Sequence, residues 1–86
     1  MSLRKLRETQ AEIDLQILNL LGKRFELSKL IAEQKVKDNV SIENLELEKQ
    51  KLKNLVKSTN LNKAFIEKLW HEIFKESKKI QKELID

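Results

Sequence analysis

The sequence contains neither cysteine nor proline, and Gly22 is its only glycine. Without cysteine the chain can form no disulfide and no thiolate metal site. Sheets need turn residues at short intervals, and this chain offers almost none of them. These absences exclude a disulfide-stabilised scaffold, argue against a β-rich fold and favour long helices joined by short polar links.

Long apolar runs are missing as well. No stretch approaches the roughly 18 apolar residues that a membrane-spanning helix needs, so we expect no transmembrane segment. The amino terminus has no signal-peptide pattern, because Arg4, Lys5 and Arg7 are followed by polar residues rather than by an apolar run. We therefore expect a cytoplasmic protein that does not bind a membrane.

Charged residues make up 37% of the chain, and the net charge is +4. Most of these charges are expected to form a solvated surface, although a positive field also attracts anions. Composition alone does not separate a nucleic acid, a membrane surface and a small dianion. Nucleic-acid binding is not favoured, because only Trp70 and three phenylalanines are available, they fall on a buried stripe, and no basic run is present.

The periodicity of the first third of the chain predicts one long helix over residues 3–36. Its apolar residues recur at helical spacing as Leu3, Leu6, Ile13, Ile17, Leu20, Leu27 and Ile31. The whole chain has only 86 residues, and a lone domain of this size buries only ~60% of its unfolded surface. The rest of so short a chain cannot cover this helix, so we expect an intertwined antiparallel homodimer.

Two further helices are predicted after the polar link at residues 37–39. Ser41 is the expected N-cap of a helix over residues 42–57, and Asn62 that of a helix over residues 62–84. The second stripe is Leu45, Leu52, Leu55 and Val56, and the third is Phe65, Ile66, Leu69, Trp70, Ile73, Phe74, Ile80 and Leu84. The expected fold class is all-α, with a long, a short and a medium helix in a single domain, residues 1–86.

Each predicted helix carries polar residues where its apolar stripe should continue. Arg24 and Lys35 interrupt the first helix, Glu48 the second, and Ser77 and Gln81 the third. Arg24 and Lys35 are almost three whole turns apart, so they share a face at a separation of about 16 Å. Two cations, a carboxylate, a hydroxyl and an amide that converge in a small bundle predict a polar pocket for an anion.

Each of these interruptions also has a purely structural explanation. An inward serine such as Ser77 commonly bonds back to a helix carbonyl, and an inward glutamine such as Gln81 can set the register of a coiled coil. Arg24 and Glu48 could form a buried ion pair. A non-catalytic helical dimerisation or interaction module is therefore an alternative function.

Arg7 adds a geometric constraint. Arg7 and Arg24 are seventeen residues apart on the first predicted helix, which is about 25 Å along its axis. They cannot both bind one small molecule from the same chain. In an antiparallel dimer Arg7 of one chain approaches Arg24 of the other, so a site shared between chains follows if both arginines are functional.

These residues, in this order, resemble the all-helical chorismate mutases. The resemblance rests on Leu6-Arg7-Glu8, Ile13-Asp14, Leu20-Leu21-Gly22-Lys23-Arg24, Lys35, Glu76-Ser77 and Gln81. It covers essentially the whole chain, which is either a separate protein or the mutase domain of a bifunctional enzyme. It implies an isomerase that converts chorismate to prephenate in phenylalanine and tyrosine biosynthesis. This rearrangement is intramolecular and pericyclic, so no nucleophile, metal or cofactor is expected.

The resemblance also implies which residues bind the substrate. Arg24 and Arg7 of the partner chain would bind the two carboxylates of chorismate, with help from Ser77. Glu48 would accept a hydrogen bond from the ring hydroxyl. An isochorismate-pyruvate lyase of the same fold would use similar anion-binding groups, and it is the alternative activity.

Lys35 and Gln81 would be the catalytic residues, because they would donate hydrogen bonds to the ether oxygen on which charge grows. Two positions depart from the family pattern. Leu47 stands where many members have an arginine, and Asn44 stands where they have an aspartate. We still expect Asn44 to contact the substrate, and Lys51, one turn beyond Leu47, is a candidate for the missing cation.

Overall fold

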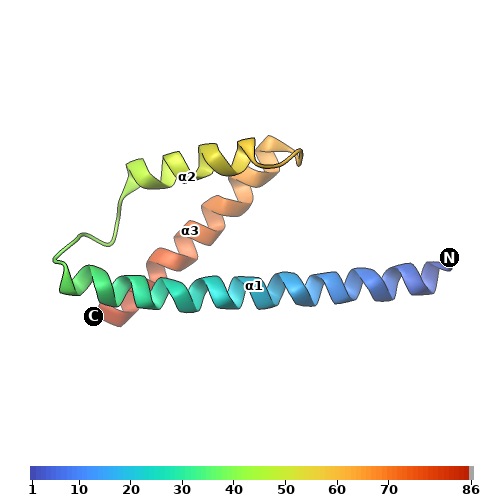
Figure 1. Ribbon diagram of the computed structural model, residues 1–86, viewed down its shortest axis with the longest axis horizontal. Coiled ribbons are helices and arrows are strands. Elements are labelled where there is room, and N and C mark those ends of the chain that lie inside the picture. The colour runs from blue at the N-terminus through green and yellow to red at the C-terminus, as the bar shows by residue number, and fades with distance from the viewer. Residues whose placement is uncertain (86) are drawn as a thin grey trace.

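The computed structural model describes residues 1–85, and they form three α-helices (Figure 1). Helix α1 spans Leu3–Lys37, α2 spans Leu45–Lys57 and α3 spans Lys63–Ile85. No strand occurs within residues 1–85, so the all-α prediction is confirmed. Helix α3 packs against both α1 and α2, and the molecule is elongated, with extents of 55 × 25 × 15 Å. The N-terminal half of α1 extends beyond the other two helices (Figure 1).

Helix α1 ends in a hydrogen-bonded turn at the predicted polar link. Asn39 adopts a left-handed backbone conformation with φ of 56°. The backbone N–H of Val40 donates to the Lys35 carbonyl at 2.8 Å, and that of Asn39 donates to the Val36 carbonyl at 3.2 Å. This pair of bonds is a Schellman motif, and asparagine tolerates the left-handed conformation better than most residues. The long helix therefore stops without proline or glycine.

Helix α2 begins at Leu45 rather than at residue 42, so the prediction that Ser41 caps it is wrong. Asn44 is the N-cap, and its Oδ1 accepts a hydrogen bond from the backbone N–H of Leu47 at 3.0 Å. Serine and asparagine cap helices about equally well, so residue type alone does not choose between them. The turn that ends α1 and the linker after it decide where α2 starts.

Helix α3 begins after the predicted cap, since the backbone N–H of Phe65 donates to Asn62 Oδ1 at 2.9 Å. Its buried apolar residues are Ile66 and Ile73, which are 3% and 7% exposed. Other members of its predicted stripe are half-buried, namely Trp70, Phe74 and Ile80. Three more are exposed, contrary to the prediction that they are buried, because one chain covers only part of this helix: Phe65, Leu69 and Leu84.

The apolar stripe of α1 stays uncovered by its own chain. Residues 1–20 are exposed throughout, and every member of the predicted stripe is between 41% and 63% exposed. The buried residues of α1 are instead Ser28 and Ala32. Helix α3 therefore packs on a face of α1 that is displaced by about one residue from the long apolar stripe.

Candidate functional site

A cavity of about 400 Å³ lies where the three helices approach one another. This volume falls within the range of small-molecule sites in proteins. Helix α1 lines it with Arg24, Leu27, Ser28, Ile31 and Lys35, helix α2 and the linker with Ile42, Asn44, Leu47, Glu48 and Lys51, and helix α3 with Phe74, Ser77, Lys78 and Gln81. On each helix these positions recur at three- and four-residue spacing, so each helix presents one face to the cavity.

The cavity brings together most of the residues that the sequence singled out. Those that line it are Arg24, Lys35, Asn44, Glu48, Ser77 and Gln81, and the candidate cation Lys51 lines it as well. Ser77 and Gln81 point inward, as predicted, and Gln81 is only 5% exposed. Arg7 is exposed and does not line the cavity. Its number places it in the N-terminal half of α1, and this half extends away from the other helices (Figure 1).

Arg24 is the half-buried cation of the cavity wall. Its guanidinium carbon lies 5.7 Å from the ring centroid of Phe74, a cation–π contact between α1 and α3. Burial lowers the pKa of Arg24 from its ordinary value, although arginine keeps its charge at neutral pH. Within residues 1–85 no carboxylate forms an ion pair with Arg24. An anion in the cavity would supply the missing counter-charge.

Glu48 pairs with a different cation from the one considered in the sequence. Lys78 Nζ lies 3.3 Å from Glu48 Oε1 and 3.4 Å from Glu48 Oε2. The alternative in which Arg24 and Glu48 form a buried ion pair is therefore wrong for this chain. The cavity consequently keeps Arg24 available on one wall and a neutralised carboxylate on another.

Ser28, Ser77 and Gln81 form a hydrogen-bond network between α1 and α3. The Ser28 hydroxyl donates to the Arg24 carbonyl at 3.1 Å, and the Ser28 and Ser77 hydroxyl oxygens are 2.6 Å apart. Because the one hydroxyl hydrogen of Ser28 is already donated, Ser77 is the donor between the two. Gln81 Nε2 donates to the Ser28 carbonyl at 3.0 Å.

This network fixes the orientation of the Gln81 amide. A carbonyl can only accept, so the amide nitrogen must face Ser28, and its second hydrogen is left for another acceptor. Ser77 bonds across to α1 and not back to its own helix carbonyl. The purely structural explanation of Ser77 as a self-bonded helix serine therefore does not describe this chain.

Lys35 lines the cavity and also hydrogen-bonds to the linker between α1 and α2. Its Nζ donates to the Ile42 carbonyl at 2.8 Å, and the side chain is half-buried. An ammonium group has three hydrogens, so this bond leaves two for other acceptors. The bond holds the Lys35 charge in the cavity wall beside the linker.

Among the cavity-lining residues with polar or aromatic side chains, three were not singled out as site residues from the sequence, namely Ser28, Phe74 and Lys78. Phe74 was assigned to the apolar stripe alone, and Ser28 and Lys78 are each adjacent to a residue on the predicted stripe. The signal that would have found them is helical spacing from the polar residues themselves. Ser28 follows Arg24 by four residues, and Lys78 precedes Gln81 by three.

Two further findings bear on the kind of site. Within residues 1–85 there is no cluster of three or more histidine, cysteine or acidic side chains arranged to hold a metal ion. None of the helices formed by these residues is long and apolar enough to cross a membrane.

Comparison with known proteins identifies relatives over most of the chain. Three curated relatives, from subspecies of Buchnera aphidicola, are named bifunctional chorismate mutase/prephenate dehydratase. The relative from the Schizaphis graminum subspecies is 44% identical over 77 residues, which are 86% of this chain and 20% of the relative. The Baizongia pistaciae relative is 41% identical over 76 residues, which are 85% of this chain and 20% of the relative. The Acyrthosiphon pisum relative is 36% identical over 87 residues, which are 98% of this chain and 23% of the relative.

The chain thus spans about a fifth of the length of the curated relatives it matches. No solved structure matches it. The family model described as chorismate mutase type II matches residues 6–82, which include Arg7 and all of the cavity-lining residues. The resemblance found in the sequence is confirmed, and the chain belongs to the chorismate mutase type II family.

Proposed function

We propose that this chain is a chorismate mutase, which rearranges chorismate to prephenate in the biosynthesis of phenylalanine and tyrosine. The observation that carries the proposal is the cavity itself. Its α1 wall holds Arg24 and Lys35 without ion-pair partners among residues 1–85, and its α3 wall holds the oriented amide of Gln81. Membership of the chorismate mutase type II family supports the same activity.

The arrangement suits a reaction that needs positioning and electrostatics rather than a nucleophile. Holding chorismate in a compact conformer brings the reacting carbons together and lowers the entropic part of the barrier. As the ether bond breaks, charge grows on its oxygen. Lys35 and Gln81 each retain hydrogens beyond those donated to Ile42 and Ser28, and they donate them to this oxygen.

Binding of the substrate carboxylates is assigned to arginine. Arg24 binds one carboxylate, since its planar guanidinium makes paired, charge-assisted hydrogen bonds. The Ser77 hydroxyl assists after rotating away from Ser28, and Glu48 accepts the hydrogen bond of the ring hydroxyl. Asn44 contributes its side-chain N–H groups from the N-cap position of α2, because its Oδ1 already accepts the hydrogen bond from the Leu47 N–H.

The second carboxylate requires Arg7 from a second chain. Within one chain Arg7 and Arg24 are about 25 Å apart along α1. An antiparallel homodimer covers the exposed stripe of α1 and brings Arg7 of the partner subunit to the cavity. Apolar surface this extensive is unusual on a monomer, which supports the dimer. We also propose a cytoplasmic location for the enzyme.

The test is turnover of chorismate by the purified protein. We expect saturable loss of chorismate absorbance. Conversion of the product to phenylpyruvate by acid would identify it as prephenate. Isochorismate assayed in parallel separates the alternatives: release of pyruvate would establish the lyase instead. A folded protein that transforms neither compound would contradict the enzymatic proposal and support a helical interaction module.

A further inference from the structure

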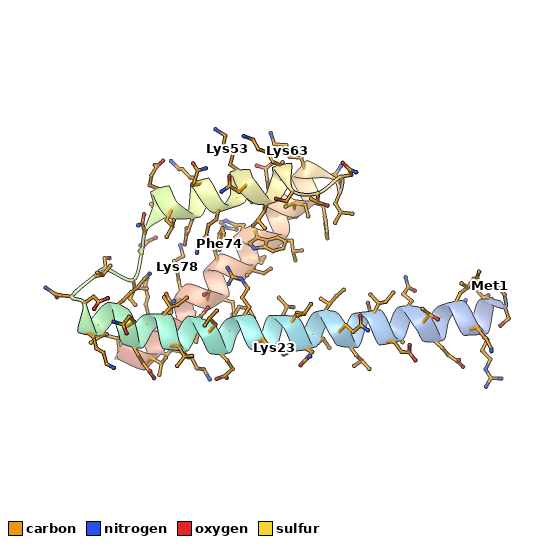
Figure 2. The ribbon with its side chains drawn as sticks, in the orientation of Figure 1. Met1, Lys23, Lys53, Lys63, Phe74 and Lys78 are labelled. Carbon is orange, nitrogen blue, oxygen red and sulfur yellow. The ribbon has the colours of Figure 1, made fainter. Side chains whose placement is uncertain are left out.

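Among the described residues of α3, Lys63–Ile85, Lys78 is the one cation that lines the cavity, and sequence periodicity did not select it. It precedes Gln81 by three residues, so these two side chains share a face of α3, and the neighbouring Ser77 lines the cavity as well. Figure 2 shows Lys78 and Phe74 on the part of α3 that runs from α2 toward α1. Its side chain is 24% exposed, which is low for a lysine.

Lys78 is held by two carboxylates at the start of α2. Its Nζ lies within 3.4 Å of both oxygens of Glu48 and 3.4 Å from Glu43 Oε1. Glu48 is as shielded as Lys78, at 24% exposed, whereas Glu43 lies before α2 and is 47% exposed. The contact with Glu48 is therefore the better shielded of the two, and it ties α3 to the first turn of α2.

Lys78 carries its positive charge at neutral pH. Burial lowers the pKa of Lys78, but hydrogen bonds and attraction to Glu48 and Glu43 outweigh it and raise the pKa above its ordinary value. Because the pKa of Lys78 is raised in the folded chain, the ion pair stabilises the fold at pH values below the ordinary pKa of lysine. This stabilisation is lost as the pH rises through the raised value.

Within residues 1–85, no other cation of the cavity is paired with Glu48. Leu47, the residue before it, carries no charge, and Lys51 lines the cavity from an exposed position. Within residues 1–85 Lys51 forms no ion pair. The charge that Glu48 meets on the cavity wall thus comes from α3 and not from its own helix.

We propose that Lys78 is a positioning residue that acts through Glu48, an inference that rests on the proposed function. An unpaired carboxylate in a cavity for a dianion would repel the ligand, because like charges at short range interact strongly in a shielded site. Lys78 neutralises Glu48 and holds both of its oxygens, which still have lone pairs for the ring hydroxyl of the substrate. Glu48 can therefore select the hydroxyl without opposing the two carboxylates.

The test compares steady-state kinetics on chorismate for the full chain and for Lys78→Met, which keeps the length of the side chain without its charge. We expect KM to rise by about tenfold while kcat changes by less than about threefold, because ground-state binding is what the ion pair supports. Lys78→Arg should recover most of the lost affinity. Lys75→Met, at an exposed position on the same helix outside the cavity, is the matched control and should match the unmodified chain.

A double-mutant cycle separates positioning from direct contact with the substrate. If Lys78 acts through Glu48, Lys78→Met should add little to the loss already caused by Glu48→Gln. Fully multiplicative losses would overturn the positioning role, since Lys78 would then act on the substrate independently. Lys78→Gln serves as a second variant if circular dichroism shows that Lys78→Met does not fold.

The two proposals fail in different ways. If the unmodified chain converts chorismate but folded Lys78→Met keeps the same KM, the role of Lys78 is overturned and the mutase proposal stands. If the unmodified chain does not convert chorismate, the proposed function fails, and the role of Lys78 fails with it.

Discussion

At the scale of single residues, two hydrogen-bond donors of the cavity already donate one hydrogen each to a backbone carbonyl. Gln81 combines near-complete burial with an amide orientation fixed by the Ser28 carbonyl, and Lys35 is anchored to the Ile42 carbonyl. Donors held in this way need little reorganisation when charge develops in front of them. This is the property that makes fixed hydrogen-bond donors effective in transition-state stabilisation.

Replacement of Gln81 by alanine tests this role. We expect Gln81→Ala to lower kcat on chorismate on the order of 10²-fold, because it removes a fixed donor from the developing charge. The effect on KM should be smaller, since the ether oxygen carries little charge in the ground state. Gln50→Ala, an exposed glutamine on α2 outside the cavity, is the control. Unchanged turnover of folded Gln81→Ala would contradict the assigned mechanism.

The pH dependence of activity follows from the same side chain. An amide donates a hydrogen bond without first being protonated, so activity should persist from mildly acidic to neutral pH. The measurement is kcat/KM across this range, with circular dichroism to confirm that the fold is retained. Activity that collapses above mildly acidic pH in a folded protein would show that a protonated acid, and not Gln81, supplies the essential hydrogen.

Sequence periodicity predicted residues of the right chemistry but could not choose between neighbours. Ser77 was placed inward by its spacing from Ile73, while Lys78, about 100° further around the helix, was left out. Both line the cavity, because α1 and α2 approach α3 from two directions. Only the packing of the helices fixes how wide a face each one presents, and that information is not local in the sequence.

At the scale of helices, the ends show where local sequence decides and where it does not. Asn62 caps α3 as predicted, since its Oδ1 accepts a hydrogen bond from the backbone N–H of Phe65. Before α2, both Ser41 and Asn44 have side chains suited to capping, and Asn44 is the N-cap. Asn39 in its left-handed conformation and the Lys35–Ile42 bond define the linker path, and tertiary contacts of this kind have no sequence signal.

Removal of the α2 cap should be measurable as a loss of stability. We expect Asn44→Ala to lower the free energy of unfolding by about 1 kcal/mol, because the N–H of Leu47 loses its acceptor. For a domain of this size that corresponds to a fall in Tm of about 4–8 °C. The measurement is thermal unfolding at fixed protein concentration, with Ser41→Ala as the matched control. An equal loss in Ser41→Ala would contradict the assignment of the cap.

At the scale of the whole molecule, the two halves of α1 have different surroundings. The C-terminal half contacts α3 and lines the cavity, while residues 1–20 are exposed and carry much of the apolar stripe. Figure 2 shows this contrast between the end of α1 at Met1 and the region around Lys23. The length of the first helix predicted that its own chain would leave its apolar stripe uncovered, as the exposure of this stripe confirms. The pairing of two copies stays a prediction, because it depends on shape complementarity between them.

Subunit exchange tests whether the site is shared between chains. Arg7→Ala and Arg24→Ala should each be nearly inactive alone. When the two are mixed and allowed to exchange, about a quarter of the unmodified activity should return. Random pairing makes half of the dimers mixed, and each mixed dimer contains one intact site.

The control is the mixture before exchange, which should stay inactive. Absence of recovery, with exchange verified by native mass spectrometry, would contradict a site shared between chains.

The uncovered stripe of α1 has a consequence for how the protein would behave on dilution. If a second copy both covers this stripe and completes the cavity, folding and turnover obey the same law of mass action. At protein concentrations below the dissociation constant of the dimer, further dilution would lower both the melting temperature and the activity per chain. A cell that makes too little of this protein would then lose more than a proportional share of its catalytic capacity.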